Sequence, residues 1–212
     1  KDAGADSDTV GNAIYVVAAS DGRLIWKAVG TNGAAMPAED DQLHFVKAMT
    51  HSIPSSLAVV DSDGNGIQDR AYVGDSGGNV WRIQLTEYAD RQADNGSANW
   101  KVSRIARLGG SGDADRRFFH APDIVRSRDS LGDYHGLLLV SVNRAGPRDT
   151  SARNFAYLLK DREHASTGLA GAGSTLALDH AELADITAAA GLSAIDYLGD
   201  VPWEDHGAAK DW

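Results

Sequence analysis

The sequence contains no cysteine among its 212 residues. Disulfide scaffolds, thiolate metal sites and cysteine nucleophiles are therefore all excluded. Basic residues are also few, because 20 Lys and Arg stand against 30 Asp and Glu and give a formal net charge of -10. Binding of nucleic acid is not expected, since contacts with phosphates need a basic face. No uninterrupted apolar run approaches the length of a membrane span, so direct membrane insertion is not expected either.

Glycine, by contrast, is abundant. The 23 glycines exceed the usual share of about 7% and indicate many tight turns. Residues 1–10 are small and acidic without apolar periodicity, which predicts a frayed lead-in. No signal peptide is visible and residue 1 is Lys, so we expect a mature or excised fragment.

Runs of β-branched and aromatic residues, separated by turn residues, predict paired strands. The paired runs are residues 14–17 with 24–26, 71–73 with 80–83, and 137–140 with 155–159. Further strand candidates are residues 56–60, 100–108 and 121–125. This arrangement favours β-propeller blades over a sandwich. We predict an all-β fold, a partial, modified propeller of about two to three four-stranded antiparallel blades over residues 11–160, with Trp26, Trp81 and Trp100 packed between blades.

The last part of the chain differs in composition. Residues 161–212 are rich in Ala, Gly and Asp and are interpreted as an insertion or connection within the same domain. A short helix is predicted at about residues 180–190. Asp179 would cap it, Glu182 would complete a capping box, and Gly191 would end it.

The acidic segment at residues 61–69 carries the most specific pattern in the chain. Its sequence, DSDGNGIQD, matches the first nine positions of an EF-hand calcium loop, with oxygen side chains at positions 1, 3, 5 and 9 and Gly at position 6. Alternate residues of such a loop point inward, so Asp61, Asp63 and Asn65 should converge. The Ile67 carbonyl adds a backbone oxygen, and Asp69 closes the shell directly or through a water. We therefore predict a Ca2+ site formed by these five residues.

The pattern departs from an EF-hand in two respects. Tyr72 stands at position 12, where an EF-hand has a bidentate Glu, and both flanks are predicted strands. The segment is therefore an EF-hand-like loop between strands. A solvated acidic turn is the alternative, because DG and NG pairs are ordinary hairpin chemistry. Magnesium is less suitable than calcium, since it keeps its waters and rarely uses an all-protein loop.

Residues 74–78, GDSGG, copy the sequence around the nucleophile of chymotrypsin-like proteases. Such a serine needs a paired His and a buried carboxylate, and neither His44 nor His51 has the sequence context of that family. We interpret the segment as a hairpin turn. His51 and His120 are interpreted as packed structural histidines, and the arginines between positions 104 and 128 as a solvated face.

Several segments resemble a known family. Residues 11–17 and 21–26 resemble a quinoprotein-type propeller repeat, with Gly22 and Trp26 at matching positions. More specific segments follow at residues 52–60, 70–82, 117–123 and 141–144. Together, and in this order, they resemble the C-terminal propeller domain of the PilY family, the type IV pilus biogenesis factors and tip-associated adhesins of Gram-negative bacteria. The resemblance covers residues 11–160 and weakens after Asp161.

The resemblance implies a calcium site in the acidic loop, held by Asp61, Asp63, Asn65, Ile67 and Asp69. It also implies that calcium occupancy modulates pilus extension and retraction, twitching motility and surface attachment. The implied partners are minor pilins or the pilus tip complex, together with a host or abiotic surface ligand. The implied location is the periplasm or the outer surface. We expect a binding protein and not an enzyme.

Two alternatives remain open. A quinoprotein dehydrogenase would hold PQQ and calcium on the propeller axis, but such enzymes commonly carry vicinal cysteines, which the chain lacks. A generic surface adhesin would use calcium only as a structural clip. Two to three blades cannot close a ring and would leave unpaired strand edges, so we expect the chain to be part of a larger domain.

Overall fold

The computed structural model describes residues 7–30, 42–85, 100–144, 146–148, 150–162 and 177–183. These residues form eleven strands in three sheets, together with two short 3-10 turns. The prediction of an all-β chain is therefore confirmed. No helix in these ranges is long and apolar enough to cross a membrane.

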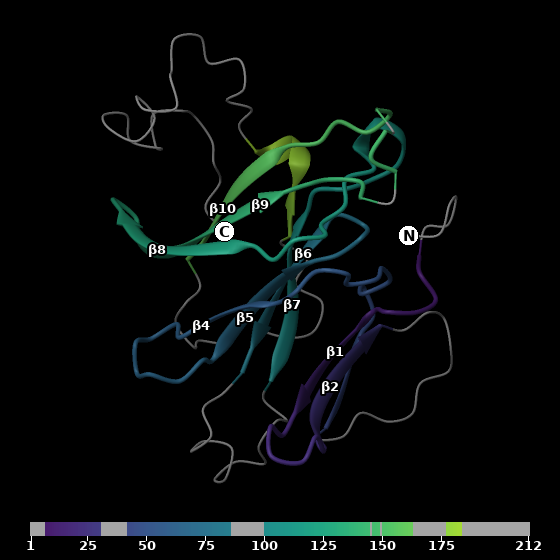
Figure 1. The fold of residues 1–212 in the computed structure, drawn as a ribbon. Coiled ribbons are helices and arrows are strands. Elements are labelled where there is room, and N and C mark those ends of the chain that lie inside the picture. The colour runs from purple at the N-terminus through teal and green to yellow at the C-terminus, as the bar shows by residue number, and fades with distance from the viewer. Residues whose placement is uncertain are drawn as a thin grey trace.

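Figure 1 shows the three sheets, which we call the N-terminal, central and C-terminal sheets. The N-terminal sheet contains, in spatial order, β1 (Ala13–Val17), β2 (Leu24–Gly30) and β3 (Leu43–Val46). The central sheet contains β11 (Leu178–Asp179), β7 (Lys101–Arg107), β6 (Asn79–Gln84), β5 (Arg70–Gly74) and β4 (Ala58–Val60). The C-terminal sheet contains β10 (Ala156–Asp161), β9 (Gly132–Val140) and β8 (Asp123–Asp129).

All three predicted strand pairs are present as antiparallel pairs, namely β1 with β2, β5 with β6 and β9 with β10. The turn between β1 and β2 shows the local cause. The Asp21 carboxylate accepts a hydrogen bond from the Arg23 N–H at 3.1 Å. Gly22 has a φ of 74°, in the left-handed region that glycine adopts without steric cost. These features reverse the chain within a few residues, so the pairing can be predicted from sequence alone.

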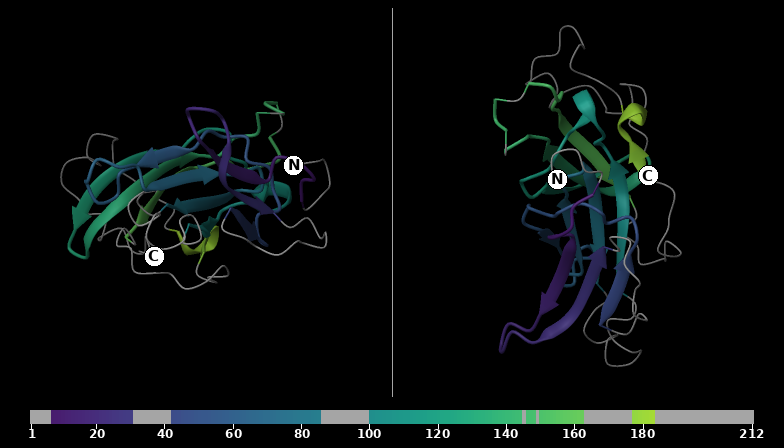
Figure 2. Two further views of the ribbon diagram at one scale, coloured as in Figure 1. Left: turned by 90° about the horizontal axis from the view of Figure 1, so that it is seen from below. Right: turned by 90° about the vertical axis from the view of Figure 1, so that its right-hand side faces the viewer.

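The central sheet is the middle layer, with the N-terminal and C-terminal sheets on opposite sides of it (Figures 1 and 2). Successive strand residues point to opposite faces, so each face of the central sheet contributes to a different core. One core joins Trp26 of β2 to Val73 of β5 and Trp81 of β6. The other joins Tyr72 of β5 to Leu137 of β9.

The predicted packing role of the three tryptophans is confirmed. Trp26, Trp81 and Trp100 are 1%, 0% and 6% exposed, and all three belong to the core between the N-terminal and central sheets. The rings of Trp26 and Trp100 meet edge to face, with centroids 5.7 Å apart. Large aromatic surfaces from different sheets therefore hold this layer boundary together.

The prediction of repeated four-stranded antiparallel blades is wrong in strand number and in two pairings. Two sheets have three strands, and the central sheet has five. β3 runs parallel to β2, and β11 runs parallel to β7. Only β4 to β7 form the expected four-stranded antiparallel meander. Parallel neighbours need a crossover connection, so no hairpin signal marks them in the sequence. The described strands do not close into a ring.

Both ends of the described chain differ from expectation. Within the predicted lead-in, Asp8 is buried and bonded to the Ser52 N–H. Near the other end, the described part of the predicted helix is a 3-10 turn over His180–Glu182. The capping box is present, since the Asp179 N–H donates to the Glu182 carboxylate at 2.9 Å. Leu183 has extended backbone, and residues 184–191 lie outside the described residues.

Candidate functional site

The acidic loop at residues 61–69 joins β4 to β5, as the flanking strand patterns predict. Its ends are held together by the strand pair, in which Val60 lies opposite Arg70. The Asp69 N–H also donates to the Val60 carbonyl at 3.3 Å. The loop therefore leaves and re-enters the central sheet at adjacent positions, which confines its side chains to a small volume.

Asp61 organises the first half of the loop. Its Oδ1 accepts hydrogen bonds from the N–H groups of Gly64 at 2.7 Å and Asn65 at 3.2 Å. Its Oδ2 accepts one from the Gly66 N–H at 2.7 Å. The bond from Gly66 is the main cause of a lowered pKa for the Asp61 carboxyl, which therefore stays ionised at neutral pH. Gly64 and Gly66 have φ values of 86° and 93°, so the chain can wrap around this carboxylate.

Asp63 and Asn65 continue the same network. Asp63 accepts hydrogen bonds from the backbone and side-chain N–H groups of Asn65, each at 3.0 Å. The Asn65 side-chain oxygen accepts one from the Ile67 N–H at 2.8 Å. The structure thus brings Asp61, Asp63 and Asn65 together in one turn, as the spacing predicts.

Asp69 lies on the other side of the loop and bonds to Ser62. Its Oδ1 accepts the Ser62 N–H at 2.7 Å, and its Oδ2 accepts the Ser62 hydroxyl at 2.6 Å. Ser62 is buried, whereas the Ile67 side chain is 45% exposed. Sequence reasoning missed Ser62, although a hydroxyl between two loop carboxylates is a recognisable signal for an internal bond. The Ser62–Asp69 pair therefore links the second residue of the loop to its last residue.

The donor set fits the chemistry of calcium in part. Carboxylate and amide oxygens are the ligands that Ca2+ prefers, and Oδ2 of Asp61, which accepts one backbone N–H where Oδ1 accepts two, keeps acceptor capacity for an ion. Both oxygens of Asp69, however, are engaged by Ser62. Across the described ranges, no group of three or more His, Asp or Glu side chains is close enough together to hold a metal. Asp61, Asp63 and Asn65 could hold the ion directly, with Asp69 exchanging Ser62 or acting through a water.

The loop also touches the C-terminal sheet. A Cβ built at Gly64 would lie 3.7 Å from Nη1 of Arg126, which projects from β8. Arg126 is exposed and stands beside the first half of the loop. The first half of the loop, which is part of the connection between two strands of the central sheet, therefore lies beside β8 of the C-terminal sheet.

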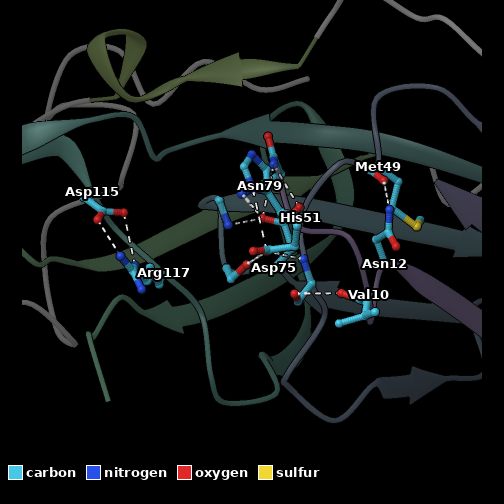
Figure 3. Close-up of polar contacts among 12 residues, drawn as sticks. Val10, Asn12, Met49, His51, Asp75, Asn79, Asp115 and Arg117 are labelled. Atoms are coloured by element: carbon cyan, nitrogen blue, oxygen red, sulfur yellow. Dashed lines mark hydrogen bonds and ion pairs between the residues drawn. The ribbon is translucent and has the colours of Figure 1, made fainter. Parts of the chain in front are cut away.

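A second polar centre surrounds the GDSGG turn (Figure 3). The fully buried Asp75 carboxylate accepts hydrogen bonds from the backbone N–H groups of Gly77 and Asn79, both at 2.9 Å, and from the Trp81 indole at 2.8 Å. Burial raises the pKa of Asp75, and the hydrogen bonds from Trp81 and Asn79 act against that increase. Asp75 therefore shapes the β5–β6 hairpin, as the interpretation of this segment as a turn predicts.

The protease-like serine is not arranged for catalysis. The Ser76 hydroxyl donates to Asp8 at 2.7 Å, and the residue is 2% exposed. Nδ1 of His51 lies 3.9 Å from Asp8, and the His51 ring packs against Gly77, where a Cβ would lie 2.1 Å from it. His51 is thus a packed histidine, as predicted. Ser76 bonds directly to the carboxylate, and no described base accepts its proton as a triad would require.

Asp8 makes a pH-dependent contribution to stability that can be measured. Burial would raise its pKa, but hydrogen bonds from Ser52 and Ser76 outweigh burial and hold the pKa well below its usual range. A lowered folded-state pKa stabilises the fold above the unfolded-state value of about 3.9, and this stability is lost as the pH falls below it. The difference in free energy of unfolding between wild type and Asp8→Asn should therefore shrink between about pH 7 and about pH 3. Denaturant titrations at both pH values check this, and a constant difference would contradict it.

Four of the six arginines predicted to form a solvated face divide into two groups by their partners. Arg107, Arg117 and Arg128 each form an ion pair, with Asp179, Asp115 and Asp133 respectively. Figure 3 shows the pair between Arg117 and Asp115. Arg116 differs, because it is buried and donates to the carbonyls of Leu108 and Arg153, both at 2.9 Å. The solvated-face interpretation is therefore wrong for Arg116, which joins two connecting segments, and for Arg117, whose side chain is only 13% exposed.

Comparison with known proteins supplies the context for this geometry. The chain matches no protein-family model. Its structure is similar to the crystal structure of the Pseudomonas aeruginosa PilY1 C-terminal domain, with a TM-score of 0.51 and 20% sequence identity over 74% of this chain. The described strands share the fold of the PilY1 C-terminal domain. The match covers 33% of that solved chain, so the present chain spans about a third of its length.

A second similarity concerns a short stretch. The chain is 70% identical over 30 residues to the FtsZ-localized protein A of Caulobacter vibrioides. The stretch covers 14% of this chain and 13% of that protein. A similarity of this extent assigns neither a family nor a function to the chain as a whole.

Proposed function

We propose that the chain is part of a PilY1-like, propeller-type domain of a type IV pilus surface protein, and that its acidic loop binds Ca2+. The observation that carries the proposal is the wrapping of residues 64–66 around the Asp61 carboxylate, with Asp63 and Asn65 in the same turn. The likeness in fold to the PilY1 C-terminal domain supports the pilus context. The role proposed is binding and not catalysis.

The chain's own residues give the loop its proposed function. Asp61, Asp63, Asn65 and the Ile67 carbonyl would hold the ion, and Asp69 would complete the shell. The bound ion would supply positive charge to a loop that carries three carboxylates at neutral pH. The loop joins β4 to β5 and lies beside Arg126 of β8. Its conformation would therefore influence the contact between β4, an edge strand of the central sheet, and β8, an edge strand of the C-terminal sheet.

At the level of the organism, this loop would make pilus behaviour sensitive to calcium. We propose minor pilins or the pilus tip complex as partners, with a host or abiotic surface as a further ligand. The readouts would be pilus extension and retraction, twitching motility and attachment. The corresponding location is the periplasm or the outer surface of a Gram-negative bacterium.

Calorimetry with calcium on wild type and Asp61→Asn tests the loop assignment. The amide keeps an oxygen acceptor but removes the charge, so calcium affinity should fall by at least about tenfold, which corresponds to about 1.4 kcal/mol. Asp21→Asn is the matched control, because Asp21 also accepts a backbone N–H in an exposed turn and should leave affinity unchanged. Equal affinity in wild type and Asp61→Asn would overturn the assignment.

A further inference from the structure

Arg126 of β8 belongs to the C-terminal sheet but lies beside the first half of the acidic loop. A Cβ built at Gly64 would lie 3.7 Å from its Nη1 atom. The Gly64 N–H donates to Oδ1 of Asp61 at 2.7 Å. With standard bond lengths, these two distances place the Arg126 guanidinium no more than about 9 Å from the Asp61 carboxylate. A full positive charge therefore stands near the oxygens that we propose as calcium ligands.

The Arg126 guanidinium does not take part in holding the described fold together. It is exposed, and within the described ranges it forms no ion pair or hydrogen bond. Arg128, two residues further along β8, is paired with Asp133. Arg70, which follows the loop directly, is buried and hydrogen-bonded to Tyr72. Unlike these two arginines, Arg126 keeps its charge available to act on the loop.

We propose that Arg126 sets the calcium affinity of the acidic loop by opposing the binding of the ion. This inference rests on the calcium site proposed above and adds to it a residue from a different sheet. The affinity of such loops depends on their charge, which here comes from Asp61, Asp63 and Asp69. The positive charge of Arg126 offsets part of that negative charge and repels a divalent cation. The loop therefore binds calcium less tightly than its own ligands would allow.

The exposure of this region determines how the repulsion depends on salt. Asp63, Gly64 and Arg126 are all exposed, so mobile ions can screen the interaction. The screening length is about 30 Å at 10 mM ionic strength and about 3 Å at 1 M. The repulsion should therefore act almost fully at the lower value and vanish at the higher one. A role of Arg126 in shaping the loop would not depend on salt in this way.

The same repulsion links the loop to the C-terminal sheet. By thermodynamic linkage, bound calcium disfavours the position of the guanidinium beside Gly64 by the factor by which Arg126 weakens calcium binding. β8, which carries Arg126, contacts β4, the strand that leads into the loop. Occupancy of the loop is therefore registered on the C-terminal sheet through the Arg126 side chain.

Calorimetric titration with calcium of wild type, Arg126→Gln and Arg126→Glu tests the proposal. At about 10 mM ionic strength, Arg126→Gln should bind calcium about threefold more tightly than wild type. Arg126→Glu should bind about tenfold more tightly, because it changes the charge at the same position by two units. At about 1 M NaCl the three proteins should bind alike. In wild type, calcium should also shift the side-chain Nε–H signal of Arg126 in a nitrogen–proton NMR spectrum.

Arg23→Gln is the matched control. Arg23 is exposed, pairs with Asp21 in the β1–β2 turn, and belongs to the N-terminal sheet on the other side of the central sheet. The control changes the net charge as Arg126→Gln does, and it should leave calcium affinity unchanged.

The possible results separate this proposal from the calcium site itself. If wild type binds calcium and Arg126→Gln binds it no more tightly at low salt, the role of Arg126 is wrong while the site stands. A gain that persists at about 1 M NaCl, or an equal gain in Arg23→Gln, would also overturn that role. If neither wild type nor Arg126→Gln binds calcium at millimolar concentration, the calcium site is wrong and this proposal fails with it.

Discussion

Replacing Asp161 with alanine is expected to lower the free energy of unfolding by about 3–5 kcal/mol. Asp161 is fully buried and accepts hydrogen bonds from Arg82 and from the Tyr72 hydroxyl. Without it, the Arg82 guanidinium and the Tyr72 hydroxyl would lose the carboxylate that both of them bind in the interior between the sheets. An unpaired buried charge costs far more than a lost surface ion pair.

Urea titration of wild type, Asp161→Ala and Asp133→Ala measures this effect. Asp133 pairs with Arg128 on the exposed face of the β8–β9 hairpin, where the arginine side chain is 75% exposed. The control should therefore lose no more than about 1 kcal/mol. Equal losses in the two variants would show that the Arg82–Asp161 pair does not hold the central and C-terminal sheets together.

The second large effect is expected for Gly78→Ala, which should destabilise the fold by about 3 kcal/mol. Gly78 has a φ of 82°, and a Cβ there would lie 2.4 Å from the Cα of Gly109. The substitution combines an unfavourable backbone conformation with a clash against another backbone segment. Turning a side chain can relieve neither the unfavourable backbone conformation nor the clash, since both involve backbone atoms.

Gly22→Ala is the matched control for this second effect. Gly22 has a similar φ of 74°, but a Cβ there would meet nothing within 4 Å. It should lose only about 1 kcal/mol, the cost of the backbone conformation alone. If both variants melt at the same temperature, the close approach of Gly78 to Gly109 is not structurally important.

The antiparallel part of the fold could be predicted because its signals are local. Residues 20–22 and 75–79 carry turn chemistry directly between two β-prone runs. The parallel pairs of β3 with β2 and of β11 with β7 have no such signal, because each joins strands separated by a long connection. β11 contains only two residues, too few for an alternating pattern to be recognised.

The candidate sites differ in the same way, because contacts within one loop could be predicted and contacts between distant residues could not. Residue spacing alone placed Asp61, Asp63 and Asn65 in one turn, since all three belong to the same loop. The bonds of Asp161 could not be predicted, because they connect residues 79 and 89 positions apart in the chain. A buried arginine such as Arg70 has no sequence signature at all, since its burial depends on how two sheets pack.

The central claim is that residues 61–69 bind Ca2+, and a crystal structure grown in calcium tests it most directly. The account predicts an anomalous peak within the loop, about 2.3–2.6 Å from oxygens of Asp61, Asp63, Asn65 and Ile67. The peak should be absent from crystals grown with a chelator. A peak at another place, or none in the loop at millimolar calcium, would contradict the account.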